Sequence, residues 1–177
     1  SLVPAPGTPR RDFVAGIPSV ASRGVGATGM LVEMRGFLSN PDGSVNTASD
    51  TGWRSVGYFT DTIPQVASAG IPNLIALSGN ARGKSKEEGL ENCALGLKRI
   101  MALAEKHRVT ICVELLNSKV NHRDYMADST KWCVELVHQV GSPRVKVLYD
   151  IYHAGMMKED VLADIKNHAD CWGHYHT

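Results

Sequence analysis

The amino-acid sequence predicts an α/β fold built around a parallel β-sheet. Short apolar runs, suited to strands buried on both faces, begin near residues 73, 109, 145 and 171. Longer segments with apolar residues at helical spacing separate these runs. A repeat of strand, loop, helix and strand at such intervals is typical of βαβ units, and it fits either an open doubly wound sheet or a (β/α)8 barrel.

The composition is that of a globular chain with no marked charge. The 177 residues carry 19 Lys and Arg against 18 Asp and Glu, and 43% are hydrophobic. This balance gives no electrostatic argument for binding nucleic acid or an anionic membrane, and we expect neither as a partner. No run of about 18 apolar residues predicts a transmembrane helix. Four cysteines without a Cys-x-x-Cys pair favour a reducing compartment, so we expect a cytoplasmic protein, with an exported location left open.

The first part of the chain gives few structural signals. Prolines and glycines interrupt residues 1–52, where we expect only a strand over 29–34. From residue 53 onward the pattern becomes regular. A helix is expected over 53–69, although Pro64 weakens this prediction, and a strand over 73–77. We expect one domain over 1–177, with its regular β/α units in 53–177.

The next helix has a clear start and a clear end. Ser85 and Glu88 match a capping box, in which each residue satisfies a backbone N–H of the other. His107 and Arg108 place cationic side chains at the other end, beside the negative end of the helix dipole. In chain order we then expect a strand at 109–116, a polar loop at 117–128, a helix at 129–140, a strand at 145–151, a helix at 158–169 and a strand at 171–176.

Three side chains that can bind a metal lie near the carboxyl ends of these strands. Glu114 belongs to the polar face of its strand, whose other face is apolar and suits packing under helices. Asp150 and His176 lie near the ends of the next two strands. Because the carboxyl ends of parallel strands meet at one edge, where ligands bind in both architectures, we expect the three side chains to converge.

Two carboxylates and an imidazole form a nitrogen and oxygen ligand set for a divalent cation. Mg²⁺ or Mn²⁺ suits such a set, with Co²⁺ or Zn²⁺ possible. The alternative is that the carboxylates form structural ion pairs, for example with Lys146 or Arg108. His153, in the expected loop after Asp150, contacts either substrate or solvent. Trp172, His174 and His176 are expected to share one face of their strand.

Five motifs occur in order between about residue 70 and residue 177: Ser78-Gly-Asn-Ala-Arg-Gly83, Glu87-Glu-Gly-Leu-Glu-Asn-Cys93, Glu114-Leu-Leu-Asn-Ser-Lys-Val120, Tyr149-Asp-Ile-Tyr-His153 and Gly173-His-Tyr-His-Thr177. They resemble those of hydroxypyruvate isomerases, which belong to the xylose isomerase-like TIM-barrel superfamily of sugar isomerases, epimerases and endonuclease-IV-type enzymes. The resemblance implies a (β/α)8 TIM barrel that is incomplete in this chain, which would hold roughly units 2 to 6. We therefore expect a fragment of a longer enzyme or a decayed copy.

The resemblance also implies a site. In the family, two glutamates, an aspartate and a histidine hold one divalent metal, and Glu114, Asp150 and His176 match three of these positions. Glu114 would also be the acid/base catalyst, and the second glutamate would belong to a strand absent here. His153 matches a histidine that contacts substrate oxygens. Together with His153, we expect two further substrate-binding residues, Asn117 and His174.

The implied reaction converts hydroxypyruvate to 2-hydroxy-3-oxopropanoate (tartronate semialdehyde) through an enediolate, within sugar and glyoxylate metabolism. The partner would be a small hydroxy-keto acid or sugar, and a homo-oligomer is possible. One alternative is a ketose 3-epimerase, but this chain has Val120 where those enzymes have a further glutamate. The near-neutral charge disfavours a DNA-repair enzyme. A non-catalytic fragment is the remaining alternative.

Overall fold

The computed structural model describes residues 29–32 and 51–177 of the chain, with side chains from residue 59 onward. Five parallel strands form one sheet in the order β1-β2-β3-β4-β5, so that strands next to each other in sequence are neighbours in the sheet. A doubly wound sheet reverses its strand order, whereas a barrel wall does not. The order therefore agrees with part of a barrel. The strands are β1 Gly29–Val32, β2 Asn73–Ala76, β3 Thr110–Glu114, β4 Val145–Asp150 and β5 Trp172–His176.

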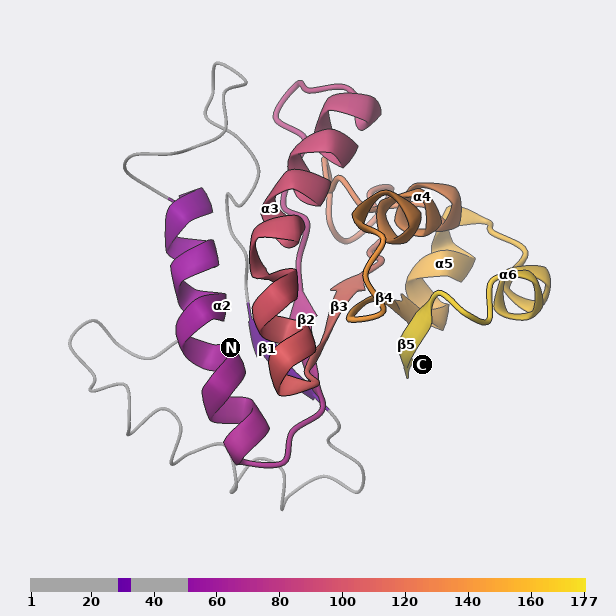
Figure 1. The fold of residues 1–177 in the computed structure, drawn as a ribbon. Helices are drawn as coiled ribbons and strands as arrows, with labels where there is room; N and C mark the ends of the chain where they lie inside the picture. Colours follow the sequence, from indigo (N-terminus) through magenta and orange to yellow (C-terminus); the bar gives the residue numbers. More distant parts are fainter. Residues whose placement is uncertain (1–28, 33–50) are drawn as a thin grey trace.

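Helices connect the strands and cover one face of the sheet. Figure 1 shows α2 and α3 side by side along the sheet, with α4 beyond them over the later strands. No helix in the described part of the chain is long and apolar enough to cross a membrane. The helices are α2 Thr51–Ser68, α3 Lys86–His107, α4 Thr130–Val140, α5 Ile151–Met157 and α6 Val161–Asn167.

The main hydrophobic core lies between the sheet and these helices. Each fully buried aliphatic or aromatic side chain contributes about 1.5–3 kcal/mol relative to an exposed one. The opposite, inner face of the sheet buries a second small cluster, formed by Ile75, Cys112 and Leu148. Core residues that are completely buried include Phe59, Ile63, Leu74, Ile111, Leu136, Val147 and Tyr149.

The helix ends follow the sequence signals. The Ser85 hydroxyl accepts the Glu88 N–H at 3.1 Å, and the Glu88 carboxylate accepts the Ser85 N–H at 3.0 Å, which confirms the capping box. Helix α2 continues through Pro64, because its buried apolar face, including Phe59 and Ile63, holds it against the core. The expected strand at 29–34 is β1, and the rest of 1–50 lies outside the described residues.

One prediction about the region after β4 is wrong. The expected loop there is helix α5, and the expected helix at 158–169 is the shorter α6. Asp150 itself caps α5, because its carboxylate Oδ1 accepts the His153 backbone N–H at 2.9 Å. A strand residue thus starts the next helix without an intervening loop, and His153 lies on that helix rather than in a loop.

A second correction concerns the face of Trp172. The register between β4 and β5 shifts, so that Val147 pairs with Trp172 and Leu148 with His174, leaving Gly173 as an extra residue. Trp172 consequently faces the helices, where its ring packs against Tyr149 at 4.7 Å between centroids. His174 and His176 do not share its face. A Cβ at residue 173 would lie 2.7 Å from the Lys146 Cβ and 2.8 Å from the Cys112 Sγ, so glycine is required there.

Candidate functional site

Glu114, Asp150 and His176 meet at the carboxyl edge of the sheet. Each lies at the end of its strand, and Asp150 and His176 pair directly in the register of β4 and β5. The His176 Nδ1 lies 3.1 Å from the Glu114 Oε1 and 3.7 Å from the Asp150 Oδ2. One ligand atom from each residue lies within 4.8 Å of the other two, so the three could hold one metal ion.

The two carboxylates of this carboxyl-edge group are unusual because they are buried beside each other. Glu114 is 9% exposed and Asp150 is 8% exposed. Burial raises the pKa of the Glu114 carboxyl; His176 opposes this shift, and the Asp150 charge adds to it. Among the described residues their ion-pair partner is His176, since Lys146 instead donates to the Asp170 backbone carbonyl. A divalent cation would neutralise this pair, so the donor set fits such an ion.

His153 lies beside the carboxyl-edge group and is joined to it by a hydrogen bond from its backbone N–H to Asp150. Its backbone N–H occupies one Asp150 oxygen, and the other oxygen faces His176. Its ring contacts the rings of His122 and Tyr152, with centroids 5.0 and 5.1 Å away. Burial lowers the pKa of His153, and the Asp150 charge partly opposes that shift. The neutral imidazole is therefore favoured at neutral pH.

The other two residues expected at the substrate lie on either side of this arrangement. Asn117 is completely buried, and its carboxamide nitrogen lies 2.6 Å from the His153 Nδ1. Its carboxamide is thus engaged by protein groups, and its contact with substrate stays a prediction. His174 lies two residues before His176 on β5, opposite Leu148 of β4. Its ring centroid is 5.3 Å from that of His176. Burial, followed by the charge of His176, lowers the pKa of His174.

Sequence reasoning missed Tyr125, which holds the backbone at Glu114. The buried Tyr125 hydroxyl donates to the Glu114 carbonyl at 3.0 Å and accepts the Ser78 N–H at 2.9 Å. It joins the ends of β2 and β3 through the loop between β3 and α4. The only signal in the sequence is an aromatic residue inside a stretch that is otherwise polar.

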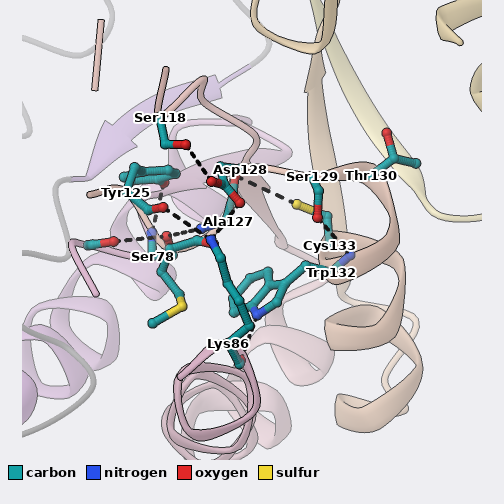
Figure 2. Close-up of polar contacts among 12 residues, drawn as sticks. Ser78, Lys86, Ser118, Tyr125, Ala127, Asp128, Ser129, Thr130, Trp132 and Cys133 are labelled. Carbon is teal, nitrogen blue, oxygen red and sulfur yellow. Dashed lines mark hydrogen bonds and ion pairs between the residues drawn. The ribbon is translucent and has the colours of Figure 1, made fainter. Parts of the chain in front are cut away.

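The loop that carries Asn117 and Tyr125 is fastened to the start of α3 (Figure 2). The Lys86 ammonium forms an ion pair with Asp128 and donates to the Met126 carbonyl at 2.7 Å. The Asp128 carboxylate also accepts from the Ser118 hydroxyl, and the Trp132 indole donates to the Lys86 carbonyl. These contacts fix a loop that would otherwise be free to move at the edge of the sheet.

A second group of potential ligands lies at the amino end of β5. The Cys171 Sγ is 3.7 Å from the His138 Nε2 and 3.9 Å from the Asp170 Oδ1. His138 and Asp170 are exposed, whereas Cys171 is buried. Burial, followed by the Asp170 charge, raises the pKa of the Cys171 thiol.

Comparison with known proteins places this fold. Residues 27–177 match the family model described as xylose isomerase-like TIM barrel. No curated protein matches the chain. Among solved structures, the chain is similar to an L-ribulose 3-epimerase, with 16% identity, a TM-score of 0.73, and coverage of 98% of this chain and 57% of that one.

Two other solved structures carry different descriptions. An AP endonuclease, family 2, from Brucella melitensis has 23% identity and a TM-score of 0.62 over 82% of this chain and 57% of that one. The IolI protein, described with a binding zinc atom, has 17% identity and a TM-score of 0.66 over 83% and 50%. The chain thus spans between 50% and 57% of the length of these three proteins. Such low identities establish the shared fold alone. On its family match and its sequentially ordered parallel sheet, this chain belongs to the xylose isomerase-like TIM barrel family.

Proposed function

We propose that this chain is a metal-dependent isomerase that converts hydroxypyruvate to 2-hydroxy-3-oxopropanoate, with its metal ligands and its acid/base residue at the carboxyl edge of the sheet. The observation that carries the proposal is the carboxyl-edge group, in which Glu114 and Asp150 are buried together with His176 as their ion-pair partner among the described residues. A buried carboxyl with a raised pKa, such as that of Glu114, is typical of functional sites. The five sequence motifs that resemble hydroxypyruvate isomerases support this substrate.

Glu114, Asp150 and His176 would hold the cation, with Mg²⁺ or Mn²⁺ favoured and Co²⁺ or Zn²⁺ possible. A bound divalent cation supplies Lewis-acid stabilisation of the negative charge that develops on the substrate oxygens. The zinc of the IolI structure belongs to that protein, and it supports only the expectation that a protein with this fold can bind a divalent cation. The choice among metals stays part of the proposal.

The proton transfer would be carried by Glu114. Its carboxylate removes a proton from the hydroxyl-bearing carbon of hydroxypyruvate, which leaves an enediolate, and a proton is then returned to the former carbonyl carbon. The hydroxyl proton moves to the former carbonyl oxygen, so the product is an isomer and no oxidant is needed. The raised pKa of Glu114 suits a group that must both accept and return a proton near neutral pH. His153 would donate a hydrogen bond to a substrate oxygen.

The second candidate is a ketose 3-epimerase or another sugar isomerase of the same superfamily. Two solved structures with similar folds are described as D-psicose 3-epimerases and another as an L-ribulose 3-epimerase, which favours this alternative. Val120 argues against it, because this exposed apolar residue stands where the resemblance to those enzymes expects a glutamate. The side chain of valine cannot form a hydrogen bond with a sugar hydroxyl.

Turnover in deuterated water tests the proposal. The chain is incubated with Mn²⁺ and hydroxypyruvate, Mn²⁺ is then removed by chelation, and NMR follows the product. We expect 2-hydroxy-3-oxopropanoate with deuterium at carbon 2, because the transferred proton exchanges with solvent on the carboxylate. Glu114→Gln should lower the rate by about 100-fold or more, since general acid/base catalysis contributes roughly 10²–10⁴-fold. Glu91→Gln, on an exposed position of α3, is the matched control.

Two outcomes would contradict the proposal. Epimerisation of a free ketose without turnover of hydroxypyruvate would establish the second candidate instead. Absence of turnover with both substrate classes, in a folded chain that binds Mn²⁺, would show that this chain is not an isomerase by itself.

A further inference from the structure

We propose that Asn117 acts on the site through His153, as a positioning residue that locks the His153 imidazole in the tautomer with its proton on Nε2. The role of this tautomer in catalysis rests on the proposed function. The preference for the tautomer itself follows from hydrogen bonds within the chain. It gives Asn117 a role different from direct contact with substrate.

The first step is a hydrogen bond with one possible direction. The Asn117 backbone nitrogen lies 3.2 Å from the His153 Nδ1. A backbone N–H can only donate, so this contact favours an Nδ1 that accepts and carries no proton. In a neutral imidazole the proton then belongs to Nε2.

The second step fixes the direction of the Asn117 carboxamide. Its Oδ1 accepts the backbone N–H of Val120 at 3.0 Å and that of Asn121 at 2.9 Å. The Nδ2 therefore faces His153 and donates to the same Nδ1 at 2.6 Å, and it also donates to the Asn121 Oδ1 at 2.9 Å. A flipped carboxamide would place its NH₂ group against two N–H donors. Both donors to Nδ1 are consequently fixed by the local backbone.

The third step concerns the ring itself. The Tyr152 hydroxyl donates to the Asn121 Oδ1 at 3.0 Å, so the aromatic neighbour of His153 is tied to the same turn. The His153 backbone is held by the Asp150 cap of α5. The position of the His153 ring and the role of its Nδ1 as an acceptor are then both fixed. The Nε2–H group is therefore the donor that the imidazole can offer to a ligand. A neutral donor stabilises an anionic oxygen without giving up its proton.

The test is a long-range proton–nitrogen correlation spectrum of the complete ¹⁵N-labelled chain, recorded without metal or substrate. His153→Gln identifies the signals by their loss. We expect Nδ1 to show the shift of an unprotonated nitrogen and Nε2 that of a protonated one, with a single tautomer. Asn117→Asp replaces the closer of the two donors, at 2.6 Å, by an acceptor of nearly the same shape, and leaves only the backbone N–H at 3.2 Å. We therefore expect a proton to appear on Nδ1. Asn167→Asp, at the exposed end of α6, is the control and should change nothing at His153.

The kinetic readout separates positioning from folding. In the Mn²⁺-loaded chain, Asn117→Asp should lower kcat by roughly 10–100-fold, the effect typical of groups that orient a functional side chain, with little change in KM. Mixed tautomers in the unmodified chain, or an unchanged His153 tautomer in folded Asn117→Asp, would overturn the proposal. If Asn117→Asp does not fold, Asn117→Ala is used, and its His153 should relax to a mixture. A locked tautomer in a chain without turnover would refute the isomerase and leave this inference standing.

Discussion

Two groups of possible metal ligands lie at opposite ends of the same sheet. The carboxyl-edge group consists of Glu114, Asp150 and His176. The amino-end group consists of His138, Asp170 and Cys171, of which the last two directly precede β5 in the sequence. In both groups the ligand atoms lie within 4.8 Å of one another, so spacing alone does not distinguish them.

Burial of charge does distinguish them. In the carboxyl-edge group two carboxylates are taken out of water side by side, which costs free energy unless a cation compensates. In the amino-end group the carboxylate and the imidazole remain exposed, and the buried member is a thiol whose raised pKa keeps it neutral. Lys146 also places its ammonium at the Asp170 carbonyl. The difference favours the carboxyl-edge group over the amino-end group as the proposed cation site.

The largest expected effect is a difference in cation affinity between matched variants. Asp150→Asn removes an anionic ligand from the carboxyl-edge group, and Asp170→Asn makes the same change at the amino end. In calorimetric titrations with Mn²⁺, we expect Asp150→Asn to weaken binding by about 100-fold or more, given that even groups behind the ligands are worth roughly 10–100-fold. Asp170→Asn should stay within about threefold of the unmodified chain. Equal losses in the two variants would remove the distinction between the groups.

A smaller effect is expected at Gly173, which lets the last strand turn His174 and His176 to the inner face. Gly173→Ala forces a Cβ against Lys146 and Cys112, and such overpacking typically costs about 1–3 kcal/mol. Gly155→Ala in α5 is the control, because its added Cβ has no atom within 4 Å apart from its chain neighbours and the backbone of its own helix. Urea unfolding measures both free energies. A Gly173→Ala chain as stable as the Gly155→Ala chain would show that glycine is not required at this position of the bulge.

Gly173 also illustrates what the sequence could and could not predict. Regular alternation places Glu114 and Asp150 correctly at the edge, because β3 and β4 keep one period along their length. One extra residue in β5 breaks that period, so Trp172 faces the core, opposite to the prediction. Helix α5 was missed because its cap is the last residue of a strand.

The contacts of Asn117 and Tyr125 lie beyond any local pattern. Asn117 meets His153, which is 36 residues away in sequence, and Tyr125 meets Ser78, which is 47 residues away. Hydrogen bonds over such distances depend on how β2, β3 and β4 are brought together. Sequence motifs indicate the proposed metal ligands because each lies on its own strand, but the residues that hold them are fixed by tertiary structure.

The smallest expected effect concerns the chemistry of two buried thiols, Cys112 in the middle of β3 and Cys171 in the amino-end group. Thiolate is the reactive form of cysteine, and burial raises the pKa of Cys112 to about 12 and raises that of Cys171 as well. At pH 8 both should be alkylated far more slowly than a free thiol. Below its pKa, the rate at Cys171 should rise about tenfold for each pH unit, because the thiolate fraction does. Mass spectrometry of the alkylated peptides separates the two sites.

Rapid alkylation of Cys171 at pH 8 would overturn the comparison. It would mean that the amino-end group already holds a thiolate, which is a strong ligand for soft cations. Slow alkylation means that a cation binding there must first displace a proton from Cys171 while it competes with Lys146 for the surrounding negative charge. At the carboxyl edge the Asp150 charge and the buried Glu114 carboxyl act in the opposite sense, because a bound cation relieves the repulsion between them. The two ends thus differ in whether binding a cation costs or releases electrostatic free energy.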